Sequence, residues 1–290
     1  MARFLLTIQY LGTRYAGWQS QQNAQGVQDV IEEALATMCQ GPITLFGAGR
    51  TDSGVHARGQ CAHVDLPIDI DPWGFVRGLN TMLPDDIRLV GAKIVDGDFH
   101  ARYHSTGKLY VYRIWNAEVA DVFTAPTHAM VKTPLDETLM QEAAKTFVGK
   151  HDFRGFTIAD PPVKTTVRTI RELRVTRDRD VIEILAWGDG FLRYMVRRIV
   201  GLLIEIGARR VALSRTSSFL EPEFAVLVQD EVDFAIVALL DQLLELNQRL
   251  GEGVLVAELR GAVQLDRILC RGGCGAERQR RGEGGGGAGG

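Results

Sequence analysis

Residues 49–57 read Gly-Arg-Thr-Asp-Ser-Gly-Val-His-Ala and set a carboxylate between an arginine and a serine–glycine turn. Apolar, strand-like segments flank this loop at 43–46 and 61–66. Glycine tolerates backbone angles that other residues resist, so the loop can turn tightly and expose its side chains. Residues two apart share a face in extended backbone, so Arg50 and Asp52 could project into one cleft. An adjacent cation would keep Asp52 ionised, as a nucleophile requires.

The same residues also fit an ordinary surface turn. An aspartate in a turn commonly accepts a hydrogen bond from its own backbone, and Arg50 would then form a solvated ion pair. Spacing alone favours this plainer interpretation of Asp52. The rest of the chain has to decide between the two.

Secondary-structure patterns recur twice along the chain. A strand at 4–10 precedes apolar positions from 27 to 38 that follow helical spacing, and Asp71-Pro72 predicts the start of another helix. The later part predicts strands at 87–95, 109–115, 166–176 and 181–187. It predicts helices at 135–148 and 191–206. Two successive strand–helix–strand–strand units predict a duplicated α+β architecture.

Length and composition narrow the class of protein. The 290 residues suffice for one large domain or two of ordinary size. No stretch approaches the ~18 uncharged apolar residues of a membrane span. The first residues lack the apolar core and cleavage site of a signal peptide, so we expect a cytoplasmic enzyme. The four cysteines are scattered and predict no zinc site.

The charge distribution leaves room for a nucleic-acid partner. The net charge of −3 argues against one, but the acidic excess is confined to residues 219–290. Earlier arginines are bunched, with Arg50 near Arg58 and further groups at 168–179 and 193–210. A local basic face can bind phosphate whatever the net charge. Ordinary solvated charge is the alternative, above all for the group at 168–179.

Three further segments accompany the aspartate loop. They lie at 9–21, at 98–103 continuing into 108–113, and at 190–201. Together with residues 49–57, and in this order, they resemble the motifs of the tRNA pseudouridine synthase A family. After about residue 210 the resemblance thins.

The resemblance implies a fold. It is α+β, with two ferredoxin-like subdomains whose antiparallel sheets join around a central catalytic cleft. We expect residues 1–104 to form the N-terminal subdomain, with the aspartate loop, and residues 105–264 to form the C-terminal one. Residues 265–290 are rich in Gly and Arg and predict a disordered tail. Residues 251–259 faintly resemble the last core strand of the family, which would carry Val254 into the active site.

The resemblance also implies an activity. It is the isomerisation of uridine to pseudouridine in the tRNA anticodon arm, at positions 38, 39 and 40. Asp52 is implied as the nucleophile, Tyr110 as the ring that stacks on the uracil, and Arg197 as the partner of Asp52. The residues implied to bind substrate or RNA are Arg50, Tyr110, Arg58, Arg14 and Val254.

The chemistry limits what else is needed. The base is detached, turned and reattached without redox change, so we expect neither a cofactor nor a metal. A glycosidase needs two carboxylates, whereas here the leaving group is kept and one carboxylate suffices. The resemblance further implies a homodimer with one tRNA spanning both subunits.

Several alternatives stay open at this point. Tyr110 also fits a core strand aromatic, and Arg197 a surface pair with Glu205. Arg193 and Arg197 are four apart and are expected on one helix face, while Arg193 and Arg198 are expected to meet solvent or phosphate. The chain could be a tRNA-binding protein without catalysis. A carboxylate-dependent glycoside hydrolase is opposed by the lack of a second acid near the loop.

Overall fold

The structure is a computed structural model that describes residues 1–158, 161–221 and 262–265, the last of these by its backbone. Val254 and the Gly/Arg-rich residues 266–290 lie outside these ranges. The first half of the chain contains β1 (Ala2–Tyr10), α1 (Val27–Cys39), β2 (Phe46–Gly47), β3 (His56–Leu66), α2 (Pro72–Asn80) and β4 (Ile87–Val95). The second half contains β5 (Lys108–Trp115), β6 (Ala129–Met130), α3 (Glu137–Thr146), β7 (Gly149–Asp152), β8 (Val167–Asp178), β9 (Val181–Gly188), α4 (Met195–Gly207) and β10 (Ala262–Leu265).

Both halves have the same topology, and this confirms the predicted α+β fold. The strands of the first half lie in the order β4-β1-β3, with β2 paired to β3. Those of the second half lie in the order β10-β5-β9-β8, and β7 extends that edge. In each half the fourth main strand lies beside the first, followed by the third and the second. This is the arrangement of a ferredoxin-like β-α-β-β-α-β unit.

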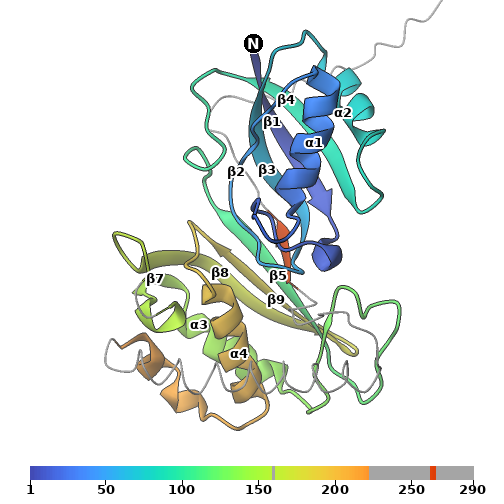
Figure 1. The fold of residues 1–290 in the computed structure, drawn as a ribbon. Coiled ribbons are helices and arrows are strands. Elements are labelled where there is room, and N and C mark those ends of the chain that lie inside the picture. The colour runs from blue at the N-terminus through green and yellow to red at the C-terminus, as the bar shows by residue number, and fades with distance from the viewer. Residues whose placement is uncertain (159–160, 222–261, 266–290) are drawn as a thin grey trace, which may run out of the picture.

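The two halves join at β10 (Figure 1). This strand runs parallel to β3, with Val263 opposite His56, and antiparallel to β5, with Gln264 opposite Tyr110. The strand in this place is therefore Ala262–Leu265, whereas the predicted strand at 251–259 lies outside the described residues. Because β3 starts at His56, the aspartate loop ends at the joint between the halves.

Each half has its own hydrophobic core. Phe4, Trp18 and Phe75 belong to the first core, beneath α1 and α2, and Phe147 and Phe156 belong to the second. The aspartate loop passes from one core to the other, because Val55 is buried in the second core and Ala57 in the first. Burial in two cores ties the loop to both halves of the molecule.

The helix starts show how well local signals work. Asp71 caps α2 as predicted and accepts hydrogen bonds from the amides of Trp73 and Gly74, both at 3.0 Å. The predicted start of α4 at residue 191 is wrong, because the helix begins at Met195. Tyr194 has a left-handed backbone, with φ of 64°, and stops the helix from extending further back.

None of the helices in the described ranges is long and apolar enough to cross a bilayer.

Candidate active site

The aspartate loop rests on the segment that follows β1. The amide of Trp18 donates to the carbonyl of Thr51 at 3.1 Å. The carbonyl of Tyr15 accepts from the amide of Gly54 and from the Ser53 hydroxyl, both at 3.2 Å. These bonds lie on either side of Asp52. They hold the loop backbone while leaving its carboxylate available.

Two glycines allow this close approach. A Cβ on Gly12 would lie 2.0 Å from the carbonyl oxygen of Val55, and one on Gly17 would lie 2.5 Å from that of Thr51. Gly17 also has a φ of 86°, which side chains rarely adopt. The segment at 9–21 therefore acts as the support of the aspartate loop, and this explains why glycines stand at these two positions.

Asp52 contacts an arginine from the other half of the molecule. Arg197 Nη2 on α4 donates to Asp52 Oδ2 at 3.3 Å across 145 residues of sequence. The Asp52 side chain is 46% exposed and that of Arg197 is 20% exposed. Thr51 is buried between the exposed Arg50 and Asp52, as the alternation of extended backbone predicts. The contact with Arg197 separates this loop from an ordinary surface turn, whose aspartate would contact its own backbone.

Tyr110 lies on β5, beside the joint between the halves. Its ring is partly buried and meets the ring of Phe191 edge to face, with centroids 5.2 Å apart. Two residues along the same strand, Tyr112 is fully buried; burial raises the pKa of its phenol, and the charge of Arg197 opposes that rise. Because residues two apart share a face of a strand, Tyr110 lies on the side of β5 that faces Arg197.

The prediction for Arg198 is wrong. We expected this residue to meet solvent or phosphate, but it is only 5% exposed and donates to the carbonyls of Gly155 and Thr157. These bonds tie α4 to the short turn at 154–157. Arg193 is exposed as expected, but it precedes α4, so the shared helix face predicted for Arg193 and Arg197 is wrong.

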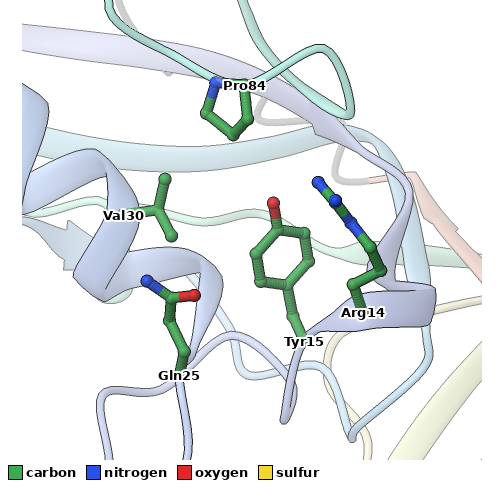
Figure 2. A pocket seen from close by; sticks show the side chains of 5 residues that line it. All are labelled: Arg14, Tyr15, Gln25, Val30 and Pro84. Atoms are coloured by element: carbon green, nitrogen blue, oxygen red, sulfur yellow. The ribbon is translucent and has the colours of Figure 1, made fainter. Parts of the chain in front are cut away.

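The other predicted binding residues are distributed more widely. Arg50 and Arg58 are exposed at the two ends of the aspartate loop. Arg14 instead borders a pocket of about 410 Å³ that is also lined by Tyr15, Gln25, Val30 and Pro84 (Figure 2). Asp52 does not line this pocket.

Asp86 accepts hydrogen bonds from two of the residues that line the pocket, Arg14 and Tyr15. Its carboxylate accepts from Arg14 Nε at 2.8 Å and from the Tyr15 hydroxyl at 2.7 Å. Burial and this contact raise the pKa of Tyr15 to about 12, so its hydroxyl keeps the proton that it donates to Asp86. Because the Tyr15 carbonyl holds the aspartate loop, the pocket and the loop share one supporting residue.

Two residues of the site escaped prediction from the sequence. Phe191 packs on Tyr110, and the ring of Tyr194 lies beneath the guanidinium of Arg197, 5.1 Å from its Cζ. Both residues lie in the motif at 190–201, but as residues of a predicted helix they gave no sign of these contacts. The only available signal was that two aromatic residues precede Arg197 in a segment that is apolar apart from its three arginines.

Similarity to known proteins agrees with this geometry. The family model described as tRNA pseudouridine synthase matches residues 6–104 and 143–225. The chain belongs to this family. The match includes the aspartate loop and α4, whose side chains meet at the Asp52–Arg197 contact.

Curated relatives of the family are similar over most of their length. The tRNA pseudouridine synthase A of Ligilactobacillus salivarius is 44% identical over 209 residues, which are 71% of this chain and 82% of the relative. That of Syntrophotalea carbinolica is 42% identical over 202 residues, covering 70% and 80%. That of Acetivibrio thermocellus is 41% identical over 221 residues, covering 76% and 91%.

Proposed function

We propose that this chain isomerises uridine to pseudouridine in the anticodon arm of tRNA, at positions 38, 39 and 40, with Asp52 as the nucleophile. The observation that carries the proposal is the half-exposed Asp52 carboxylate, held against Arg197 at the joint of the two halves. The names of the curated relatives support tRNA as the substrate.

The surroundings of Asp52 suit this chemistry. The reaction breaks the bond between uracil N1 and the anomeric carbon, and the base then reattaches through its carbon 5. Asp52 either attacks the anomeric carbon or removes a proton to start glycal formation. The Arg197 guanidinium holds the carboxylate that both routes need, through the contact at 3.3 Å. No electron or group leaves the substrate, so the reaction requires neither a metal nor a cofactor.

Tyr110 is the ring that we propose to receive the base. A uridine in a stem has to be extruded before a carboxylate can reach its sugar, and extrusion costs a few kcal/mol. Stacking of the uracil on an aromatic ring offsets part of that cost. The Phe191 ring, packed edge to face on Tyr110, holds this platform in one orientation. The Tyr110 hydroxyl is also our candidate for the final proton transfer at carbon 5.

The exposed arginines complete the proposal. Arg50 and Arg58 flank the aspartate loop and would contact phosphates on either side of the extruded nucleotide. Arg14 adds a more distant contact through its exposed side chain. We further propose a homodimer of this chain, with one tRNA spanning both subunits, and residues 1–104 and 105–264 as its subdomains.

The test is incubation of the purified protein with unmodified tRNA, followed by mapping of pseudouridine through carbodiimide adducts. We expect adducts at positions 38, 39 and 40. A well-folded protein that binds the tRNA without producing adducts would instead be a tRNA-binding member of the fold, and the proposed activity would be wrong. Adducts at other positions would support the isomerase activity and contradict the proposed target positions.

A further inference from the structure

Tyr194 adopts a backbone conformation that needs a reason. Its φ of 64° and ψ of −1° lie in the left-handed region, where a bulky residue is a rare outlier. It stands at the N-cap of α4, yet its side chain makes no capping hydrogen bond. Asparagine or glycine would adopt this backbone more readily. The identity of this residue must therefore be explained by what its ring contacts.

The ring of Tyr194 lies beside two guanidinium groups. The Cζ of Arg193 is 4.8 Å from the ring centroid, and the Cζ of Arg197 is 5.1 Å from it. Both distances are within the range in which a cation is attracted to an aromatic face. Arg193 Nη2 also donates to the Tyr194 hydroxyl at 2.9 Å, which holds the ring from its outer edge.

Arg197 needs such support because its polar contacts are few. Its contact with Asp52 is a single one, between Nη2 and Oδ2, and is long at 3.3 Å. Its Nε is buried and has no hydrogen-bond partner among the residues that the structure describes. A guanidinium held through one nitrogen can pivot about that contact. The Tyr194 ring, whose centroid lies 5.1 Å from Arg197 Cζ, restricts that motion.

We propose that Tyr194 is a positioning residue that holds the Arg197 guanidinium in the orientation that meets Asp52. The inference rests on the proposed function, because the orientation matters only if Asp52 carries the chemistry. The left-handed backbone of Tyr194 then has a purpose, since it makes α4 begin at Met195 and brings the ring to Arg197. Tyr194 itself need not touch the substrate.

The experiment compares Tyr194→Asn and Tyr194→Phe with the wild-type protein. Asparagine relieves the backbone strain but removes the ring, so we expect the melting temperature to stay level or to rise by about 2–4 °C. The single-turnover rate at saturating tRNA should nevertheless fall about tenfold, with the Kd for tRNA within about twofold. Phenylalanine keeps the ring and should recover most of that rate.

A matched control is Gln40→Asn. Gln40 also has a left-handed backbone, with φ of 54°, and lies at the C-cap of α1. This change should give a similar gain in melting temperature with the rate retained. A Tyr194→Asn protein with the wild-type rate overturns the proposal, as does one whose rate falls only together with its melting temperature. A loss confined to Kd would make Tyr194 an RNA contact instead.

The failure of this inference can be told from failure of the proposed function. If the wild-type protein forms no pseudouridine, the proposed function is wrong, and the crystal structure of Tyr194→Asn becomes the test of positioning. We expect Arg197 to have left Asp52 in that structure. An unchanged contact between Arg197 and Asp52 would overturn the positioning role without reference to activity.

Discussion

Replacing Arg198 by methionine should destabilise the protein far more than the same change at its neighbour Arg197. The Arg198 side chain is 5% exposed and donates to the carbonyls of Gly155 and Thr157. A hydrogen bond from a charged group contributes about 1.5–3 kcal/mol, and a carbonyl left buried without a donor costs a similar amount. Methionine fills much of the space and removes the buried charge, which offsets part of this loss.

The net cost for Arg198→Met is therefore about 2–4 kcal/mol of unfolding free energy. That corresponds to a melting temperature lower by roughly 5–15 °C. The contact of Arg197 with Asp52 is partly exposed and screened by water, so Arg197→Met should cost at most about 1 kcal/mol. Turnover should instead be lowered more by Arg197→Met than by Arg198→Met, because Arg197 contacts Asp52, the proposed nucleophile. We expect it to fall about 100-fold or more for Arg197→Met.

The assay is thermal melting of both variants, with single-turnover rates measured well below the lower melting temperature. Arg198→Met should retain most of the wild-type rate there, and Arg197→Met should retain most of the wild-type stability. Equal shifts in melting temperature for the two variants would refute the assignment of one arginine to the core and the other to the site. A larger shift in melting temperature for Arg197→Met than for Arg198→Met would reverse the assignment.

Three further predictions follow from the site and its surroundings. Tyr110→Phe should lower turnover about 100-fold while tRNA binding stays within a few fold, since the ring still stacks; near-normal turnover would limit Tyr110 to stacking. The Kd for tRNA should rise at least about tenfold between about 50 and 200 mM salt as arginine–phosphate contacts release counterions, and a flat salt response would contradict these contacts. Burial, His100 and Arg3 lower the pKa of His63 from 6.5 to about 4, so only the unfolded chain takes up a proton as pH falls from 6.5 towards 4. Stability should thus drop by roughly 2 kcal/mol between about pH 7 and 5 and by less in His63→Asn, and equal drops would show that His63 does not contribute.

Much of the fold could be predicted because its signals are local. The helical spacing between residues 27 and 38 gave α1 with its ends nearly correct, and Asp71-Pro72 gave the start of α2. The strand at 87–95 was predicted with its observed bounds. Each of these depends on neighbouring residues, on a cap, or on the period of the apolar side chains.

The rest depended on contacts between distant residues. Arg197 and Arg198 are adjacent arginines in an apolar helix, and no local pattern shows which one faces the core and which one Asp52. The start of α4 at Met195, later in the chain than predicted, depends on the left-handed backbone of Tyr194, which is not the residue type expected in that conformation. Strand Ala262–Leu265 pairs with β3 and β5 although it lies far from both in the sequence. The spacing of residues along the chain did not predict which segment would form this strand.

The most direct test of the account is the behaviour of Asp52→Asn on unmodified tRNA. The change keeps the size of the side chain and removes the carboxylate that we propose as the nucleophile. We predict no pseudouridine at positions 38, 39 and 40, with a Kd for tRNA within a few fold of the wild-type value, because the arginines supply most of the phosphate attraction. Single-turnover activity above about one per cent of the wild-type rate in this variant would contradict the role of Asp52.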